Sequence, residues 1–575
     1  MQYRPEHPNP QWERKNWRNL NGTWEFDFDF SASARERKLY KGGALPKTIT
    51  VPFCPESELS GIGYKDFMDA VCYRKVVELS ADEISGTVFL HFGAVDYKAY
   101  IYVNGKEAGT HMGGFSSFRV DITDFVTEGE NVIFVIAEDN VRSKEQPGGK
   151  QSGKLGSYGC YYTRTTGIWQ TVWLEFAPKA YVKSAKYYTD IESGTLTVVG
   201  ETCGAGEVKL TASYEGRPMG ETSVKVCGGT FGAQIQLAEK HLWEVGCGRL
   251  YDLVIEFGED RVQSYFGLRK VHLEGKKFML NNKCVFLRQV LDQGYYPDGI
   301  YTAKSDEELK RDIEISMAAG FNGARLHQKV FEKRFLYHCD KMGYLVWDEL
   351  GNWGMNYENI AASHNFFCEW LEVMERDFNS PSVIGWCPFN ETWNYYEYKT
   401  FVHNRVIETA YRMTKAMDAT RPCIAVSGNF HVPGIMEIHD VHDYCDLETF
   451  KKAYENFDDG LVKDQVYRRY KDIQKFTPGK PVFVSEYGGF KWVEGSEEGP
   501  AWGYGDAPKT KEELLQRYTD YTNILLDNPD IMGLCYTQLY DVEQEQNGLY
   551  TYERKPKLDM EKVKAVNTRK AAIED

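Results

Sequence analysis

The pattern of hydrophobic and polar positions changes twice along the chain. Up to residue 179, short runs of β-branched and aromatic residues recur, separated by turn sequences such as Asn104-Gly105 and Pro147-Gly148-Gly149. No stretch in this part has the length and period of an amphipathic helix. The pattern predicts an all-β sandwich or jelly roll over residues 1–179. The clearest strand-like runs are Thr87–Phe92, Ala99–Val103, Val132–Ala137 and Thr171–Phe176.

Residues 180–268 carry a second set of short strand-like runs. The length of this segment suits a small immunoglobulin-like sandwich. It lacks the paired cysteines and the tryptophan spacing of antibody domains, so the pattern predicts the architecture alone. The runs are Leu196–Val199, Val208–Ser213, Thr222–Val226 and Leu250–Phe257.

From residue 269 onward, strands alternate with helices. Ser305-x-x-Glu308 is a capping box that opens a helix, Gly320 closes this helix, and the strand Phe321–Leu326 follows. Such alternation is typical of a parallel α/β fold, and no glycine-rich dinucleotide loop follows the first strand. Length and repeat number predict a (β/α)8 TIM barrel over residues 269–575. Further helices are expected at 332–342, 366–378, 398–417, within 447–475 and at 510–526, and further strands at 344–350, 382–389, 423–426, 440–444, 481–485 and 531–536.

Charge and cysteine content narrow the partners and the compartment. The chain of 575 residues carries 68 basic and 84 acidic residues, a net charge of −16. Phosphate binding needs clustered cations, so this balance argues against nucleic acid and anionic membranes as partners. No segment has the apolar length of a signal peptide core or a membrane span. The 13 cysteines are odd in number, scattered and without a C-x-x-C pair, which favours reduced thiols in the cytoplasm.

In a barrel of this type, functional residues lie at the carboxyl ends of the strands. Two near-apolar strands each lead into a glutamate with a polar or aromatic neighbour, namely Asn390-Glu391 and Glu486-Tyr487. A lone strand-end glutamate is usually a salt-bridge partner or a helix cap. Two of them at one barrel mouth are better explained as a catalytic pair. Other polar residues at predicted strand ends are Arg325, His327, Asp348, Glu349, residues 439–444, Gln538 and Asp541.

Paired carboxylates can cleave a glycosidic bond. One donates a proton to the leaving oxygen while the other attacks the anomeric carbon, and anionic neighbours stabilise the oxocarbenium-like transition state. The proton donor needs a raised pKa and the nucleophile must stay ionised, so the two carboxylates need different environments. The residues therefore favour an enzyme that acts on carbohydrate.

Several segments carry more specific motifs. Residues 19–24 (NLNGTW) and 164–169 (RTTGIW) lie near the ends of the first predicted domain. The predicted barrel contains residues 320–325 (GFNGAR), 340–343 (DKMG), 347–349 (WDE), 389–391 (FNE), 485–489 (SEYGG) and 554–557 (RKPK). Together these motifs resemble glycoside hydrolase family 2, which contains β-galactosidases, β-glucuronidases and β-mannosidases, and the resemblance covers the whole chain.

The resemblance implies roles for the strand-end residues. Glu391 would act as general acid and then as general base, and Glu486 as the nucleophile, in a retaining double displacement. Asn390 would bond the sugar 2-hydroxyl and Tyr487 would steady the nucleophile. The division of roles between the two glutamates comes from the family rather than from the spacing.

Departures from the family pattern bear on specificity. Family β-glucuronidases bind the sugar carboxylate with an Asn-x-Lys pair, whereas this chain has Asn547-Gly548-Leu549, so glucuronidase activity is not expected. Residues 288–295 (RQVLDQGY) replace the family's Asn-Arg-His-Glu segment, and no metal and no cofactor are expected. Tyr536 takes the place of the tryptophan expected after the last barrel strand.

Further residues are candidate substrate contacts, each with a structural alternative. Asp292 could bind sugar hydroxyls or order its own loop. His327 and Lys329 could contact substrate or nucleophile, or form packing and salt bridges. Residues 439–443 (HDVHD) contain metal-ligand types, but the spacing favours support of the site over a metal site. The expected substrate contacts are Asp292, Arg325, His327, Lys329, Asn390, Tyr487, Trp393, Tyr536 and Gln538, and Trp353, Trp492 and Trp502 are further stacking candidates.

The main hypothesis is a retaining exo-β-glycosidase with β-galactosidase-like or β-glucosidase-like activity. Two accessory β domains and long loops after the strands would narrow the barrel mouth into a pocket. An endo-acting glycanase on the same barrel and a non-catalytic carbohydrate-binding protein are the alternatives. The sequence does not define the oligomeric state, so a homo-oligomer stays open.

Overall fold

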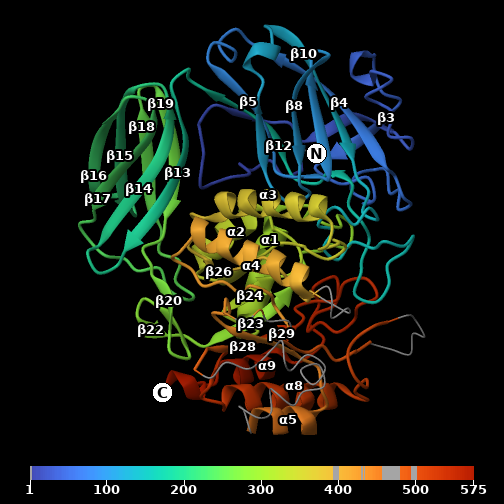
Figure 1. Cartoon of the computed structure of the whole chain (residues 1–575), viewed down its shortest axis with the longest axis vertical. Helices are drawn as coiled ribbons and strands as arrows, with labels where there is room; N and C mark the ends of the chain where they lie inside the picture. The colour runs from blue at the N-terminus through green and yellow to red at the C-terminus, as the bar shows by residue number, and fades with distance from the viewer. Residues whose placement is uncertain (1–2, 393–399, 429–431, 433, 456–478, 494–500) are drawn as a thin grey trace.

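The computed structural model describes residues 3–392, 400–428, 432, 434–455, 479–493 and 501–575. Two β-rich parts lie side by side above a strand–helix barrel (Figure 1). The order of the three parts along the chain is the one expected from the sequence pattern. Trp393 lies outside the described residues, so its expected stacking role stays a prediction.

The first part is a sandwich of two antiparallel sheets. Strand β10 shows why the sequence folds this way, because Ile133, Val135 and Ala137 face the core between the sheets while Phe134 and Ile136 pack in a smaller cluster on the other face. The four-stranded sheet has the order β1 (Trp17–Asn19), β12 (Val172–Ala177), β5 (Thr87–Phe92), β9 (Phe118–Asp121). The six-stranded sheet has the order β3 (Lys47–Val51), β2 (Gly22–Phe28), β4 (Ala70–Leu79), β10 (Gly129–Glu138), β7 (Lys98–Val103), β8 (Lys106–Met112).

The second part is a smaller β-sandwich with its own core. In strand β18, alternate residues from Tyr251 to Phe257 are fully or almost fully buried, while Asp252 between them is exposed. One sheet has the order β13 (Tyr181–Asp190), β14 (Thr195–Cys203), β17 (Gly229–Gln236). The other has the order β16 (Arg217–Val226), β15 (Gly206–Tyr214), β18 (Tyr251–Phe257), β19 (Asp260–Phe266).

The third part is a curled parallel sheet surrounded by helices. Parallel bridges from Trp386 to Cys423 and from Asn390 to Ser427 place residues 423–427 beside β26, and the Ser427 hydroxyl contacts Asp440 of β27. These contacts join the two ends of the sheet, so it closes into a barrel. The sheet order is β26 (Val383–Cys387), β25 (Leu345–Glu349), β24 (Gly323–Leu326), β23 (Leu287–Asp292), β29 (Ile531–Thr537), β28 (Val482–Gly488), β27 (His439–Asp443). The helices in the described part of the barrel are α1 (Asp306–Ala318), α2 (Lys333–Met342), α3 (Ile360–Asp377), α4 (Thr400–Met417), α5 (Leu447–Glu455), α8 (Lys511–Leu526) and α9 (Met560–Asn567).

Two local expectations differ from the structure. Helix α3 begins at Ile360, six residues before the expected start, because the Asn359 side chain accepts a hydrogen bond from the Ala361 amide and caps the helix there. Ser305 precedes α1 as expected, but its side chain makes no capping bond to the helix. Glu308 instead accepts a bond from the amide of Lys304.

A loop of the first domain covers part of the barrel mouth. The amide of Gly148 donates to the carbonyl of Trp353, and Gln544 donates to the carbonyl of Tyr161. Gly149 has φ +59°, and a Cβ there would lie 2.3 Å from the carbonyl oxygen of Gln328, so the close approach of the two domains requires glycine. The accessory domain is therefore built into the wall of the mouth.

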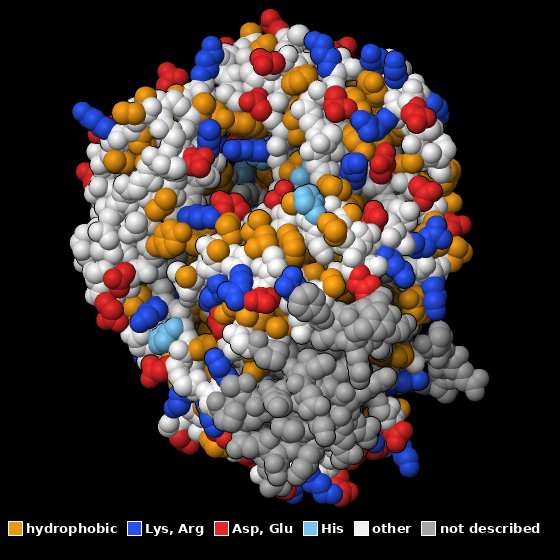
Figure 2. All heavy atoms as spheres, viewed as in Figure 1, with side chains coloured by type: hydrophobic (Ala, Val, Ile, Leu, Met, Phe, Trp, Pro, Cys, Tyr) orange, Lys and Arg blue, Asp and Glu red, His pale blue; other side chains and the backbone are white. Residues whose placement is uncertain are grey.

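The face shown in Figure 2 carries acidic and basic side chains in a mixed distribution, without a broad basic field of the kind that nucleic acid needs. Among the helices that the structure describes, none combines the length and the apolar character needed to cross a membrane.

Candidate active site

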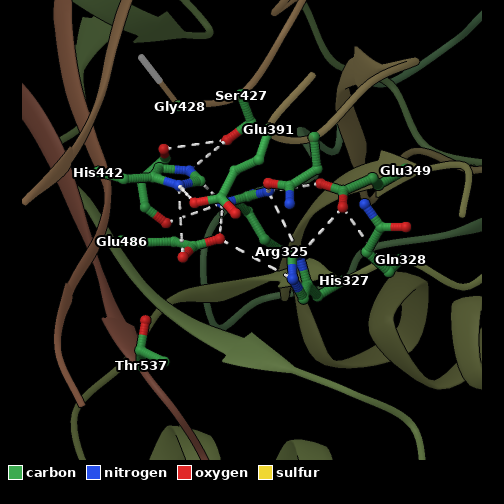
Figure 3. A network of polar contacts seen from close by, with 12 residues as sticks. Arg325, His327, Gln328, Glu349, Glu391, Ser427, Gly428, His442, Glu486 and Thr537 are labelled. Carbon is green, nitrogen blue, oxygen red and sulfur yellow. Dashed lines mark hydrogen bonds and ion pairs between the residues drawn. The ribbon is translucent and has the colours of Figure 1, made fainter. Parts of the chain in front are cut away.

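The expected catalytic pair converges at the carboxyl end of the barrel. Glu391 follows β26, Glu486 lies in β28, and His442 of β27 lies between their carboxylates (Figure 3). One carboxylate oxygen from each glutamate and one ring nitrogen of His442 all lie within 4.8 Å of one another. Two glutamates that are far apart in sequence therefore face one another across a small gap.

Glu486 is held as an ionised group. Its Oε2 accepts a 2.6 Å hydrogen bond from the Tyr444 hydroxyl, and its Oε1 lies 3.3 Å from Nη1 of Arg325. Burial alone would raise the pKa of Glu486, but the charges of His442 and Arg325 outweigh it and lower the pKa to about 2. A nucleophilic carboxylate needs this environment at neutral pH.

Glu391 has a different environment. Its backbone lies in the left-handed region, with φ +44°, and its amide donates to the carbonyl of Ser427. Non-glycine residues in this region cluster at functional sites, where the surrounding structure must hold them. The Glu391 side chain is 17% exposed, and in the described part of the chain its ionic partner is His442 rather than an arginine or lysine. The two glutamates thus differ in solvent contact and in neighbouring charge.

Arg325 organises the floor of the site. Its Nη2 donates to Glu349 at 2.6 Å and to Oδ1 of Asn390 at 3.0 Å. Burial alone would raise the pKa of Glu349, but Arg325 and His327 beside it keep this pKa below its ordinary value. Glu349 therefore orders the site. Burial lowers the pKa of His327, whose Nε2 lies 3.9 Å from Glu486.

Asn390 has an amide group that is ready for a ligand. The side-chain Oδ1 of Asn390 accepts a hydrogen bond from Arg325. The backbone N–H of Asn390 donates to the side chain of Asn352. The Nδ2 of Asn390 is buried and has no hydrogen-bond partner among the described residues. A buried donor without a partner is costly unless a ligand or water satisfies it. This geometry fits the expected contact with a sugar hydroxyl, which stays a prediction.

Two expected contacts take other positions in the structure. The hydroxyl of Tyr487 bonds to Thr522 of helix α8, outside the barrel, so Tyr487 does not steady the nucleophile as predicted, and Tyr444 does so instead. Tyr536 packs against Tyr487 in the same outer layer. Side chains alternate along a strand, so the next residue, Thr537, faces the site, and its hydroxyl lies 2.9 Å from that of Tyr444.

Other expected contacts are engaged within the protein. Asp292 accepts bonds from the Tyr540 hydroxyl and the Gly294 amide, which is the loop-ordering role considered above. Lys329 donates to the carbonyls of Gly294 and Tyr301. Burial lowers the pKa of Lys329 to about 7. Gln538 bonds to Gln293 and Asn547 through its two amide atoms. These hydrogen bonds are all made within the protein, and substrate contact by the three residues stays a prediction.

Lys150, which the first domain brings into the site, is not among the residues that the sequence pattern singled out. It is 5% exposed, its Nζ lies 3.9 Å from Glu545, and it lies over the ring of Trp353. Burial alone would lower the pKa of Lys150, but Glu545, Glu486 and Glu391 raise it. The Gly148-Gly149 pair before this lysine indicates that the backbone can approach another segment closely, but it does not indicate which segment.

Within the described residues, Glu391, His442 and Glu486 are also the one group of three that could surround a metal ion. Each of them already contacts another member of the group or a neighbouring residue, as expected of an acid–base cluster. His439 and Asp440, which the sequence raised as ligand types, lie in the same strand, and Asp440 accepts bonds from two serine hydroxyls.

Comparison with known proteins agrees with this architecture. A β-glucuronidase of Streptococcus agalactiae is 24% identical over 86% of this chain and 87% of its own length. A β-galactosidase of Thermoanaerobacterium thermosulfurigenes is 24% identical over 82% of this chain and 64% of its own length. The solved structure of a β-glucuronidase from Ruminococcus gnavus in complex with D-glucuronic acid superposes with a TM-score of 0.81, at 20% identity, over 98% of this chain and all of that one.

Family models match two of the three parts. Residues 17–148 match the sugar binding domain of glycosyl hydrolases family 2, and residues 271–571 match its TIM barrel domain. The barrel match covers more than half of the chain and contains both glutamates of the site. The chain therefore belongs to glycosyl hydrolase family 2 and is a glycoside hydrolase.

Proposed function

We propose that this protein is a retaining exo-β-glycosidase. The observation that carries the proposal is the approach of the Glu391 and Glu486 carboxylates, whose nearest oxygens lie within 4.8 Å of one another. Retaining glycosidases hold their two carboxyl groups about 5–5.5 Å apart, whereas inverting enzymes leave room for a water molecule at about 6.5–9.5 Å. The short gap favours direct attack on the sugar.

The environments of the two glutamates support the division of roles. Glu486 is ionised and fixed by Tyr444 and Arg325, so it is suited to attack the anomeric carbon. Glu391 contacts His442 and retains some solvent exposure, so it can deliver a proton to the leaving group and later take one from water. Breaking the C1–O bond thus accompanies proton transfer from Glu391 and bond formation from Glu486.

Exo action is supported by the loop that covers the mouth. The first domain supplies residues 148–163, which bond to Trp353 and to the loop that contains Gln544 and Glu545. A groove that binds a polymer along its length would be open at both ends, without a loop that covers it. Release of oligosaccharides from within a polymer would indicate the endo-acting alternative.

A neutral terminal sugar is favoured over a glucuronic acid. Asn547 donates to Glu545 at 3.1 Å, and Leu549 stands where the Asn-x-Lys pair would have its lysine. Lys150, the cation beside this loop, lies 3.9 Å from Glu545, which offsets its charge. Lys557, whose backbone amide donates to the carbonyl of Leu549 in this loop, is paired with Asp541 at 2.6 Å. We therefore keep β-galactoside and β-glucoside as the candidate substrates, although relatives include β-glucuronidases.

Finer features of the molecule belong to the same proposal. The first sandwich, over residues 1–179, is proposed to be a jelly roll, the second, over residues 180–268, to be immunoglobulin-like, and the catalytic barrel to span residues 269–575. All 13 cysteines are free thiols, which supports the cytoplasm as the compartment.

The experiment is a side-by-side assay of para-nitrophenyl β-galactoside, β-glucoside and β-glucuronide, with ¹H NMR of the first product formed. The proposal expects hydrolysis of a neutral glycoside and initial release of the β-anomer. Initial release of the α-anomer would refute retention. Binding of sugars without any hydrolysis would favour a non-catalytic binding protein.

A further inference from the structure

His442 is placed between the two catalytic carboxylates. Its Nδ1 lies 2.7 Å from Oε1 of Glu391 and 3.4 Å from Oε2 of Glu486 (Figure 3). Two lone pairs repel each other at 2.7 Å, so one proton must lie between Nδ1 and the Glu391 oxygen, whichever of the two atoms carries it. The imidazole side chain is 2% exposed, so water does not compete for this proton freely.

The other ring nitrogen of His442, Nε2, is held by a buried chain that consists of a hydroxyl group and a carboxylate. Nε2 lies 2.9 Å from Oγ of Ser427, and Ser427 lies 3.1 Å from Oδ1 of Asp440. Because Asp440 is an acceptor for the Ser427 proton, a lone pair of Ser427 is left for the N–H at Nε2. This arrangement orients the ring and turns Nδ1 toward the glutamates.

The charges around His442 come from four barrel elements. Glu391 follows β26, Asp440 lies in β27 with His442 itself, Glu486 lies in β28, and Arg325 of β24 places Nη1 3.4 Å from Nε2. Three carboxylates outnumber one guanidinium in this set. Burial alone would lower the pKa of His442, but Glu486 and Glu391 outweigh it and raise this pKa. The surroundings therefore favour a proton held near Nδ1.

We propose that His442 is a positioning residue that shares the proton of Glu391 and keeps this proton available for the leaving group. The inference rests on the proposed double displacement. In the first step the shared proton passes from Glu391 to the glycosidic oxygen as the C1–O bond breaks and the bond from Glu486 to C1 forms. The Glu391–His442 pair is then without its proton.

The second step restores that proton. A water molecule attacks C1, the bond from Glu486 breaks, and the proton of the water returns to the Glu391–His442 pair. In between, the carboxylate of Glu391 faces the lone pair of Nδ1. Their mutual repulsion makes the pair a stronger base for the attacking water. The same histidine thus serves both halves of the reaction without bonding to the sugar.

The kinetic test compares His442→Asn with the wild-type enzyme on aryl β-glycosides whose leaving groups differ in basicity. We expect kcat/KM to fall at least about tenfold for poor leaving groups and less than about threefold for a dinitrophenyl glycoside, because an activated leaving group needs little protonation. The basic limb of the pH profile should move to lower pH, because the variant lacks the imidazole whose pKa Glu486 and Glu391 raise. An equal loss on all substrates with an unchanged basic limb would show a merely structural role.

Two further variants keep the test interpretable. Ser427→Ala retains the imidazole but removes its partner at Nε2. It should give a smaller change in the leaving-group dependence and in the basic limb. It replaces His442→Asn if that variant does not fold. His338→Asn is the matched control. His338 is also buried and lies 3.0 Å from the carboxylate of Asp306, but it belongs to helix α2 and lies outside the site. This control should leave the leaving-group dependence unchanged.

A measurement without turnover separates this inference from the proposed function. NMR titration of the His442 imidazole should show a pKa above that of an unperturbed histidine in the wild type, and a lower one in Glu391→Gln. Identical titration in both proteins would overturn the shared proton, whatever the substrate. Absence of hydrolysis by the wild type, together with a coupled titration, would reject the proposed function and leave the proton-sharing geometry intact.

Discussion

Replacing Tyr444 by phenylalanine removes a single hydroxyl group from the candidate active site. The ring of Tyr444 stacks on Tyr504 at 3.5 Å between centroids, with the two planes 4° apart, so the phenylalanine ring has the same packing surface. The hydroxyl donates a 2.6 Å bond to Oε2 of Glu486 and also lies 2.9 Å from Thr537. The substitution therefore tests one hydrogen bond to the proposed nucleophile.

The size of the effect follows from the charge of the acceptor. A hydrogen bond to an ionised group contributes about 1.5–3 kcal/mol, twice or more the value of a neutral one. At 1.36 kcal/mol per factor of ten in rate, that range corresponds to about 10- to 150-fold. The carboxylate of Glu486 loses charge when it bonds to the sugar and regains charge when it leaves. We therefore expect the larger loss in the second step, in which the regained charge needs the donor.

Pre-steady-state kinetics with a dinitrophenyl β-glycoside can separate the two steps. Tyr444→Phe should retain a rapid burst of phenol and show a slower steady state, and its acid limb should move to higher pH because the ionised form of Glu486 is less stabilised. Tyr504→Phe, which removes the hydroxyl from the other ring of the stack, is the control. An unchanged steady-state rate and an unchanged acid limb would refute the role given to Tyr444.

Three other substitutions test separate parts of the account. Glu391→Ala should reduce kcat/KM by about 10²- to 10⁴-fold for poor leaving groups and much less for activated ones, and a uniform loss would contradict its acid role. Asn390→Ala should lower kcat/KM on the order of 100-fold for a glycoside with its 2-hydroxyl, but should leave kcat/KM for the 2-deoxy analogue at the wild-type value for that analogue. An equal loss on the 2-deoxy analogue would exclude the 2-hydroxyl contact. Lys329 is neutral in the folded protein above about pH 7, whereas in the unfolded chain it still binds its proton. The thermal stability of the wild type relative to Lys329→Met should therefore rise from pH 7 toward pH 10. A stability difference that stays constant over this range would rule out the lowered pKa.

The barrel and the proposed catalytic pair were accessible from sequence because their signals are local. A near-apolar run that ends in a polar residue defines a strand and its end, and the carboxyl ends of parallel strands meet at one edge. Glu391 and Glu486 could therefore be placed together without coordinates. Strand alternation could also have assigned Thr537, rather than Tyr536, to the inside, because one-residue steps reverse the face of the strand.

Contacts between domains could not be predicted in the same way. Lys150 reaches the site because Gly149 lets its loop approach Gln328, and nothing in the local sequence says which part of the barrel this loop meets. The role expected for Tyr487 failed for a different reason. Tyr487 follows Glu486 within β28, so its side chain faces the opposite side of the strand and bonds to Thr522 of α8. Tyr444, which directly follows β27, lies beside the nucleophile instead.

Covalent trapping is the most direct measurement of the central claim, which is that Glu486 attacks the sugar. The enzyme would be incubated with a 2-deoxy-2-fluoro β-glycoside of the preferred sugar that carries a dinitrophenyl leaving group, then digested and examined by peptide mass spectrometry. The account predicts one sugar per chain, attached to Glu486, and none in Glu486→Gln. A label on any other carboxylate, or turnover that never passes through a labelled enzyme, would contradict it.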